Sequence, residues 1–487
     1  MRRTMTVAAT VLGLLLSTAA SAIAQASADP PGATISSTQV RLGSIAGRTP
    51  VKAAAAALNL NPRITNQFDG IVQNQANSCG GQCRPSPSVA SSGTQLAEVT
   101  NAFIQVHTTT GGVLCGGGVT LNRLLRTTDQ LFDPKIQFDM DRRRFSLMVT
   151  VFPASSTAPP VLWVAASDTA DACGTWRVYR LGFSSPIQPG SWLKEPGLGQ
   201  NPASLLFSFT AQPVFTGGPV QFYVFGLPKS AVYSGGGVSV RPFAVAGGVT
   251  PASHVGFPMV SGTNAWFVGS IRGQGYRLYR LTNGGGSGAV LTNVPVFSAP
   301  WSSPTRALLQ PPPGLGGLTL TFGEIASNAW FDGQRVWFTH EVDNGGLPSI
   351  RYGAIDTATG SVRYGLVKRN TGSEDGNPSI GVGLSTTGDL VVHLNWVVTQ
   401  PSANLPASLM VERINGSQLL TDRIGTGALY LVGATTNTGF LFGGYSSISV
   451  DMLRNTGALC AVGVQQYFIT GGTWRTRIAR AGDCPAQ

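Results

Sequence analysis

Hydrophobic and polar residues alternate along many short segments of this chain, and turns separate the segments. The alternation is clear in TNAFIQVHT (100–108), in PKIQFDMDRRRFSLMVTV (134–151) and in WRVYRLGF (176–183). A period of two is typical of a β-strand that rests one face on a core. No amphipathic helical pattern separates the segments, which excludes parallel βαβ units and predicts antiparallel meanders.

Several of these strand pairs repeat one another. PSIGVGLSTTGDLVVHL aligns with SSISVDMLRNTGALCAVG when Ile380 is placed over Ile448, and a weaker copy is anchored at Ile136. Strand repeats of about 40 to 70 residues are typical of propeller blades, which bury their faces only against neighbouring blades. We therefore expect an all-β fold: a single β-propeller of six or seven antiparallel four-stranded blades over residues 98–487.

A ring of blades has to join its two ends, because an open last blade would leave an unpaired edge. The last alternating segment, TWRTRIARAG (473–482), lies close to the C-terminus. We expect it to pair with residues from the N-terminal part of the chain.

The N-terminal region reads as an export signal followed by an extended arm. Arg2 and Arg3 precede a short apolar stretch and the small residues of ASAIAQA, which predicts a signal peptide over residues 1–24. The stretch is too short to span a bilayer, so we expect no transmembrane segment. Residues 25–97 are predicted to form an extended N-terminal arm, with one short helix at VKAAAAALNL (51–60). The mature protein is expected to be secreted or periplasmic.

Composition supports a turn-rich β-protein. The chain has 62 glycines and 31 prolines, and only 11% of its residues are charged. The net charge of +11 becomes +9 when Arg2 and Arg3 leave with the signal peptide. This charge predicts an anionic polysaccharide or a cell-envelope glycan as partner. The competing interpretation is scattered surface arginine with no dedicated partner. Because no long basic run occurs, nucleic acid is not expected as a partner. The protein is expected to be a monomer.

Six cysteines predict disulfide bonds, since an even number in an exported chain favours pairing. Fifteen connectivities exist for six cysteines. The spacing favours a small Cys79–Cys83 loop and a Cys460–Cys484 bond at the tail, which leaves Cys115 for Cys173. No histidine or second cysteine pair lies near CGGQC, so no metal site is expected.

Few residues offer catalytic chemistry. A polysaccharide lyase needs a base, and His340 and His393 are the candidates for an acid/base role. For His393, a hydrogen-bonded core position is the favoured alternative. Asp139 and Asp141 resemble half of a calcium loop or an ordinary turn, and the turn is favoured. We therefore expect no cofactor, with a structural calcium ion as the alternative, and the spacing of the histidines does not support a zinc site.

Two acidic residues and several tryptophans have less distinctive settings. Glu374 and Asp375 in TGSEDGNPS are predicted on a loop, which is either solvated, the favoured interpretation, or a site for a metal ion or a sugar. Most tryptophans are expected in the blade core. They are Trp163, Trp266, Trp330, Trp337 and Trp396.

Ligands of propellers tend to meet at the mouth of the central channel, where the inner strands begin. The residues at these positions are Asn101, Asp133, Asn377 and Tyr445. They are the predicted binding residues, brought together by the geometry of a ring.

The order of these motifs resembles a broad group of secreted bacterial β-propellers of largely unassigned function, which are loosely similar to sialidase-type propellers. The resemblance runs from NQFDGI through FDPKIQFDMD and PSIGVG to FGGYSSISVD and ITGGTWRTRIA. In that group the matching phrases are Asp-Pro-x-hydrophobic-x-Tyr-Asp, Tyr-Pro-x-Ile and Trp-Gly-Asp-Tyr-Ser. This chain departs at Gly444, where the group has aspartate, and at Asn377, which precedes Pro378. The arginine triad of sialidases has no counterpart at matching positions.

The favoured function is therefore an extracellular binding or surface-interaction protein for anionic glycans, because a rigid ring with polar loops suffices for it. The alternative is a glycan-active enzyme, either a polysaccharide lyase or a glycoside hydrolase, with its site at the channel mouth.

Overall fold

The strands of the chain form antiparallel meanders. The computed structural model describes residues 35–42, 64–73, 84–101, 103–255, 260–310, 315–318, 325, 327–385, 387–433, 445–452, 459–469 and 473–484. The first three sheets follow the order of the sequence. They contain β3 (Ser88–Ser91), β4 (Gln95–Thr100), β5 (Phe103–Thr108) and β6 (Val119–Thr120); β7 (Leu131–Asp139), β8 (Arg144–Val151), β9 (Val161–Ser167) and β10 (Thr175–Gly182); and β11 (Ser191–Gln200), β12 (Ser204–Pro213), β13 (Gln221–Pro228) and β14 (Phe243–Val245).

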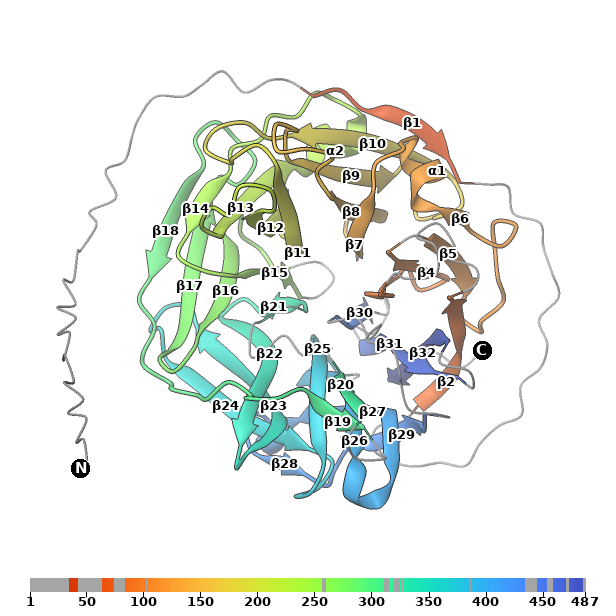
Figure 1. Ribbon diagram of the computed structural model, residues 1–487, viewed down its shortest axis with the longest axis vertical. Helices are drawn as coiled ribbons and strands as arrows, with labels where there is room; N and C mark the ends of the chain where they lie inside the picture. Colours follow the sequence, from red (N-terminus) through yellow and green to blue (C-terminus); the bar gives the residue numbers. More distant parts are fainter. Residues whose placement is uncertain are drawn as a thin grey trace, which may run out of the picture. The chain divides into compact units, whose positions relative to one another are not determined.

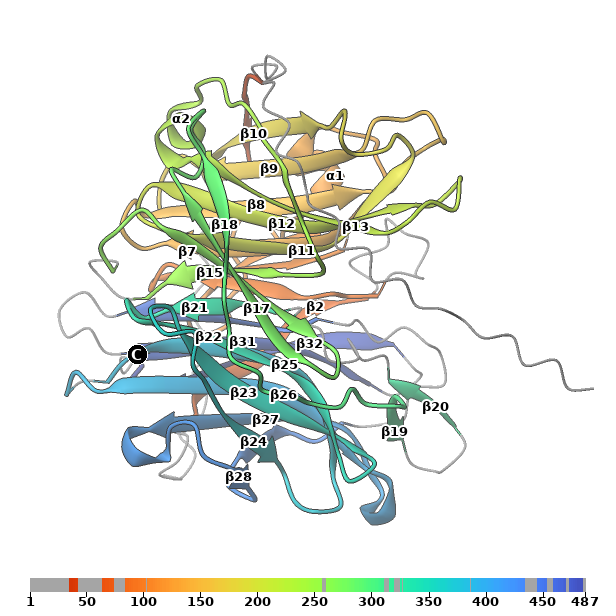
Figure 2. The same cartoon turned by 90° about the vertical axis from the view of Figure 1, so that its left-hand side faces the viewer.

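Two further meanders join through their first strands into one larger sheet. Ala252 pairs in parallel with Ala329, and the side view places the two strands next to each other (Figure 2). The strands are β15 (Thr250–His254), β16 (Ala265–Ile271), β17 (Gly275–Thr282) and β18 (Val290–Val294), then β21 (Ala329–Phe331), β22 (Arg335–Asn344), β23 (Leu347–Asp356), β24 (Val362–Lys368) and β28 (Arg423–Ile424).

The last sheets complete the arrangement. One contains β25 (Glu374–Leu384), β26 (Leu390–Gln400), β27 (Leu405–Asn415) and β29 (Ala428–Leu431). Another contains β30 (Ser447–Met452), β31 (Leu459–Phe468), β32 (Trp474–Gly482) and β2 (Ile64–Val72). β19 (Leu308–Gln310) and β20 (Leu315–Leu318) form a separate hairpin. The helical segments described are α1 (Leu121–Leu125), α2 (Lys229–Ser234) and two single 3-10 turns, Pro401–Ala403 and Gly416–Gln418.

Within the unit Ala33–Gln487 the sheets surround a centre, with the first strand of each meander innermost (Figure 1). Ile136, Ile380 and Ile448, the anchors of the sequence repeat, are buried on β7, β25 and β30. The prediction of an antiparallel β-propeller is confirmed by this topology. No helix in the described part of the chain is long and apolar enough to cross a membrane.

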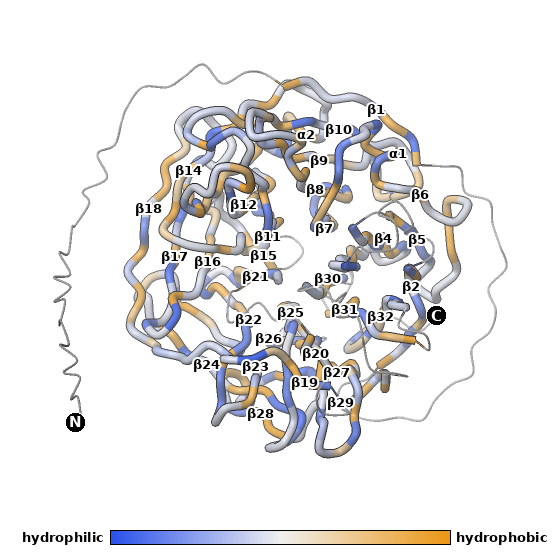
Figure 3. The backbone as a smooth tube through the Cα atoms, in the orientation of Figure 1, coloured by the Kyte–Doolittle hydropathy of each residue, from blue (hydrophilic) through white to orange (hydrophobic). Residues whose placement is uncertain are grey.

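The core lies between neighbouring sheets. One hydrophobic cluster joins β3–β6 to β7–β10, and the next joins β7–β10 to β11–β14. Every residue of β31 is buried, because a blade is covered on both faces. Figure 3 shows hydrophobic positions recurring along the strands of each sheet. The predicted core tryptophans are buried, with Trp337 and Trp396 fully enclosed.

The ends of the chain meet in one sheet, as predicted. β2 pairs antiparallel with β32, and Phe68 lies opposite Ile478. The segment expected as an arm also supplies β1 (Thr38–Arg41), which pairs with β10, and β3 of the first sheet. The predicted signal peptide and the short helix at 51–60 lie outside the described residues.

Two disulfide bonds match the predicted pairing, Cys115–Cys173 and Cys460–Cys484. Cys79 and Cys83 lie outside the described residues. The Cys460–Cys484 bond joins the start of β31 to the residues just after β32, and so secures the closing sheet.

Loop-closure entropy predicts the effect of removing that bond. A double Cys460→Ser and Cys484→Ser variant should lose about 3 kcal/mol of unfolding free energy, because a loop of 24 residues is no longer closed in the unfolded chain. Chemical denaturation monitored by tryptophan fluorescence measures the loss. A variant within 0.5 kcal/mol of the wild type, roughly the error of such measurements, would contradict the expectation.

Candidate functional site

Two of the predicted binding residues lie at bulges in the innermost strands. The pairing of β7 with β8 shifts between Phe132 and Lys135, and that of β25 with β26 shifts between Gly376 and Ser379. At each shift a residue with positive φ precedes a proline: Asp133 (φ 48°) and Asn377 (φ 49°). Aspartate and asparagine tolerate this conformation, and proline needs no ladder partner at a bulge. The same arrangement occurs at Glu195–Pro196 in β11 (φ 53°).

Side chains from the preceding sheet hold both bulges. Asn101 Oδ1 accepts a hydrogen bond from the backbone N–H of Asp133 at 2.7 Å. Glu341 Oε1 accepts one from the N–H of Asn377 at 2.8 Å. Asn101 also donates from Nδ2 to the carbonyl of Arg84 at 2.7 Å. Asn101 therefore connects two neighbouring blades by hydrogen bonds. These bonds hold the backbone of Asp133 at the centre of the ring.

Lys135 lies two residues beyond Asp133 and carries the most unusual charge in this region. Its side chain is only 8% exposed, and its ammonium lies 4.0 Å from the centre of the Tyr445 ring. Burial lowers the pKa of Lys135 to about 8, although the nearby Asp133 acts in the opposite direction. Burial also raises the pKa of the Asp133 carboxyl, against the effect of Lys135 and of a hydrogen bond from Ser86.

The ammonium of Lys135 has no hydrogen bond and no ion pair within 4 Å anywhere in the described part of the chain. Its contact with the ring of Tyr445 is a cation–π interaction, which stabilises a cation by about 0.5–2 kcal/mol. Removing an ammonium from water costs several kcal/mol, so this contact offsets only part of the cost. Lys135 is thus a largely buried cation whose neighbouring anion, Asp133, lies beyond the 4 Å of an ion pair.

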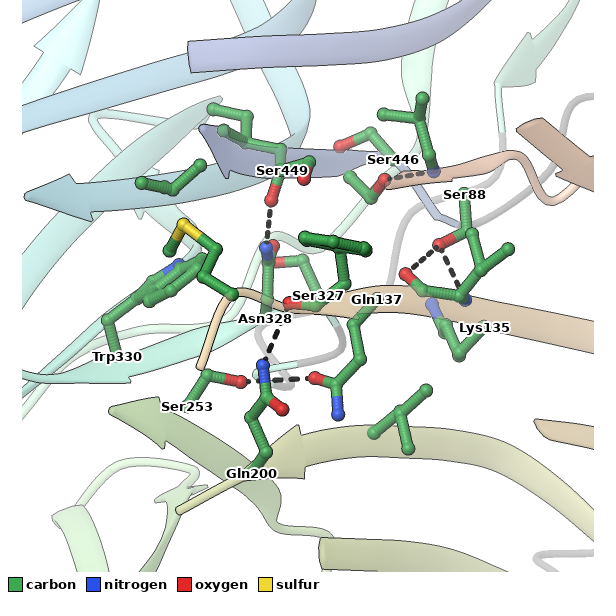
Figure 4. A pocket seen from close by; sticks show the side chains of 18 of the residues that line it. Ser88, Lys135, Gln137, Gln200, Ser253, Ser327, Asn328, Trp330, Ser446 and Ser449 are labelled. Atoms are coloured by element: carbon green, nitrogen blue, oxygen red, sulfur yellow. Dashed lines mark hydrogen bonds between the residues drawn. The ribbon is translucent and has the colours of Figure 1, made fainter. Parts of the chain in front are cut away.

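Lys135 lines a cavity between the innermost strands (Figure 4). The lining comes from β3, β7, β11, β15, β21 and β30, together with the segment before β21. Its volume is about 50 Å³, against about 300–1,000 Å³ for a typical small-molecule site. Six serines contribute hydroxyl groups: Ser88, Ser253, Ser327, Ser446, Ser447 and Ser449.

The four predicted residues form one connected group. Asn101 contacts Asp133, and Lys135 links the charge of Asp133 to the ring of Tyr445. Ser446, next to Tyr445, donates to the carbonyl of Asn377 at 2.8 Å.

Lys135, Glu341 and Ser446 were missed in the sequence. For Lys135 the available signal was a charged residue just after an Asp-Pro bulge on an inner strand. Glu341 lay hidden inside a buried alternating strand, with nothing to mark its contact with Asn377.

The two histidines proposed for acid/base chemistry lie away from this group. His340 is buried, with Nε2 2.9 Å from the hydroxyl of Tyr276 and the Trp301 ring 4.7 Å from its own. His393 is fully buried on β26, and neither ring nitrogen has a hydrogen-bond partner among the residues that the structure describes. Burial, aided by the charge of Arg413, lowers the pKa of His393 to about 3, so this ring is neutral at physiological pH. His393 therefore lies in the core, as the core interpretation expects, but it lacks the expected hydrogen bond among the described residues.

Acidic residues elsewhere have structural roles. Asp139 Oδ1 accepts hydrogen bonds from the N–H groups of Asp141 and Arg142, as expected for a turn. Its other oxygen contacts the ammonium of Lys229 at 2.6 Å. No group of three metal-ligating side chains occurs among the described residues.

The prediction of a solvated loop at Glu374 and Asp375 was wrong. Both residues are buried at the start of β25. Asp375 accepts hydrogen bonds from Trp396 Nε1 at 2.8 Å and from the Ser373 hydroxyl at 2.6 Å. Glu374 pairs with Arg306 at 2.8 Å. Burial raises the pKa of Asp375 to about 6, despite these bonds. The bulge at Asn377 lets β25 extend through residues that look like a loop.

No protein-family model and no curated protein matches the sequence. Solved structures are similar only distantly. Trypanosoma rangeli sialidase in complex with sialic acid is 9% identical (TM-score 0.41), with 78% of this chain and 57% of that chain covered. The parainfluenza virus 5 hemagglutinin-neuraminidase is 13% identical (TM-score 0.37; 80% and 93% covered), and an α-L-arabinofuranosidase from Lactobacillus brevis is 8% identical (TM-score 0.35; 73% and 96% covered). The chain thus spans just over half the length of the sialidase.

Proposed function

We propose that the protein is a secreted β-propeller that binds carboxylate-bearing glycans at the mouth of its central cavity. The observation that carries this proposal is the ammonium of Lys135, which lies over the Tyr445 ring, has no ion pair within 4 Å among the described residues, and lines a cavity that also carries serine hydroxyl groups. A carboxylate bound there would supply the missing counter-anion and form a charge-assisted hydrogen bond. The net charge, +11 for the full sequence and +9 without Arg2 and Arg3, favours the approach of an anionic polymer.

The size of the cavity supports recognition of an end group. A volume of about 50 Å³ holds a carboxylate and the hydroxyl groups next to it, so the rest of a glycan would lie outside, against the mouth. Asp133 and Tyr445 interact with Lys135 but do not line the cavity, so Lys135 and the serines of the lining are the groups that such a ligand would contact.

The lining favours binding over hydrolysis. Glycoside hydrolases ordinarily use two carboxyl groups that flank the scissile bond, and none of the described residues that line this cavity is an aspartate or a glutamate. His254 lines it, but each of its ring nitrogens lies 3.1 Å from a carbonyl oxygen, of Val260 and of Asn264. Burial lowers the pKa of His254, against the effect of these two backbone contacts.

The experiment is retention of the purified protein on immobilised uronate- and sialate-containing polysaccharides, with dextran as the neutral control. We expect retention on the acidic polymers at physiological salt and no release of unsaturated or reducing ends. Retention on dextran equal to that on the acidic polymers would contradict the proposal. Absence of retention on every polymer would contradict it as well. Release of such ends would show an enzyme instead.

The pH dependence of binding distinguishes Lys135 from surface charges. The charged form binds the anion, so affinity is present below the pKa of the free lysine, about 8, and is lost as pH rises through it. Between pH 7 and pH 9 the charged fraction falls about tenfold, whereas ordinary lysines and arginines keep their charge. The groups facing Lys135 are the carboxyl of Asp133 and the ring of Tyr445.

Isothermal titration with an oligouronate should therefore show affinity about tenfold weaker at pH 9 than at pH 7. A flat profile up to pH 10 would mean that exposed arginines bind the polymer.

A further inference from the structure

Three other polar groups around the same cavity have no partner. They are Gln200 Oε1, Asn328 Oδ1 and Ser327 Oγ, which are buried and accept or donate no hydrogen bond within the described ranges. Gln200 is 5% exposed. Figure 4 shows the three side chains around the cavity with Lys135.

The orientation of the two amides is fixed by their nitrogen atoms. Gln200 Nε2 donates to the carbonyl of Phe138 at 3.0 Å, and Asn328 Nδ2 donates to the carbonyl of Ile448. A flipped amide would set its oxygen against a carbonyl oxygen. The free atoms are therefore amide oxygens, which accept hydrogen bonds and never donate them.

These oxygens require a donor, and a simple anion has none. A carboxylate bound to Lys135 would leave both of them unsatisfied, and a buried unsatisfied acceptor opposes binding. Hydroxyl groups on the same ligand would satisfy them. The hydroxyl of Ser327 could then accept from the ligand or donate to it.

We propose that the cavity selects a hydroxylated carboxylate, the acid-bearing edge of a sugar acid, over an anion of equal charge that lacks hydroxyl groups. Lys135 recognises the charge, and Gln200, Asn328 and Ser327 recognise the hydroxyl groups. This inference rests on the proposed function and specifies the chemical class of its ligand.

The first test compares three small probes by isothermal titration: glucuronate, cyclohexanecarboxylate and glucose. Glucuronate should bind at least tenfold more tightly than either of the others. Equal binding of glucuronate and cyclohexanecarboxylate would overturn the inference and leave anion binding intact. Binding of neither acid would overturn the proposed function as well.

The second test uses two serines of the same cavity. Ser327→Ala removes a hydroxyl that has no partner, so folding should be unaffected. Ser253→Ala is the matched control, because the Ser253 hydroxyl already donates to Gln137 Oε1 at 3.2 Å. Ser327→Ala should weaken glucuronate binding at least threefold and leave cyclohexanecarboxylate unchanged, while Ser253→Ala should leave the ratio of the two affinities unchanged. Equal losses of glucuronate affinity in both variants would contradict the assignment, and a thermal melt checks that each variant is folded.

Discussion

Replacing Glu98 with alanine is expected to lower the free energy of unfolding by about 2–6 kcal/mol, because two buried hydrogen-bonding groups would each lose their partner at about 1–3 kcal/mol apiece. Glu98 is fully buried on β4. Its Oε2 lies 3.1 Å from His107 Nε2 and accepts a hydrogen bond from the N–H of Ile71 at 3.1 Å, while Oε1 accepts one from the hydroxyl of Thr476. One carboxylate therefore joins the first sheet to both ends of the chain.

The position of this carboxylate explains the size of the effect. The pairing of β2 with β32 is interrupted between Asp69 and Val72, so the N–H of Ile71 has no ladder partner on β32. Glu98 satisfies that group. Its loss would leave the Ile71 N–H and His107 without this partner, and the Thr476 hydroxyl with the carbonyl of Ile71 at 3.1 Å as its acceptor, and would weaken the sheet that closes the ring.

Urea denaturation with the disulfides intact measures the effect, and hydrogen exchange of the β2 amides locates it. Gly70→Ala provides a second variant, because a Cβ at Gly70 would collide with the Glu98 carboxylate and the Thr476 hydroxyl. Gly182→Ala is its control, since a Cβ there meets nothing within 4 Å. If Glu98→Ala or Gly70→Ala were as stable as Gly182→Ala, ring closure would not depend on this contact.

Much of the fold could be predicted because its determinants are local and repeated. Alternation along β8 or β26 identifies a strand without any knowledge of its neighbours, and the copies anchored at Ile136, Ile380 and Ile448 indicate a ring. Burial of both faces of each sheet could be predicted from the ring, since stacked blades cover both sides of each strand. Glu374 and Asp375 were misassigned because acidic residues next to glycine and asparagine usually mark a loop, whereas here buried hydrogen-bond donors satisfy both carboxylates.

The candidate site was harder to predict, because its contacts join distant parts of the chain. The residues at strand beginnings could be named, since a ring brings them together. The partner of Lys135 could not be named, because Tyr445 is far from Lys135 in the sequence. In addition, a single lysine in an alternating strand usually faces solvent. Its burial follows from the packing of β7 against the strands beside it.

Replacing Lys135 with glutamine is expected to weaken the binding of acidic glycans roughly ten- to hundredfold, because a hydrogen bond to a charged group contributes about 1.5–3 kcal/mol. The same change should leave the free energy of unfolding unaltered or raise it, since it removes a largely buried ammonium that has no hydrogen bond or ion pair within 4 Å among the described residues. Arg363→Gln, an exposed position on β24, makes the same change in net charge and should alter affinity less than about twofold.

The opposite signs of the two effects separate function from structure. A lysine that served only to pack against Tyr445 would lose stability on substitution and leave glycan binding unchanged. A lysine held in place for a ligand has the reverse signature, because the unbound protein bears the cost of an unpaired charge that the bound carboxylate removes. Titration calorimetry and urea denaturation of the Lys135→Gln and Arg363→Gln proteins measure both quantities. Loss of stability together with wild-type affinity would rule out Lys135 as the anion-binding residue and direct attention to the arginines on the surface of the ring.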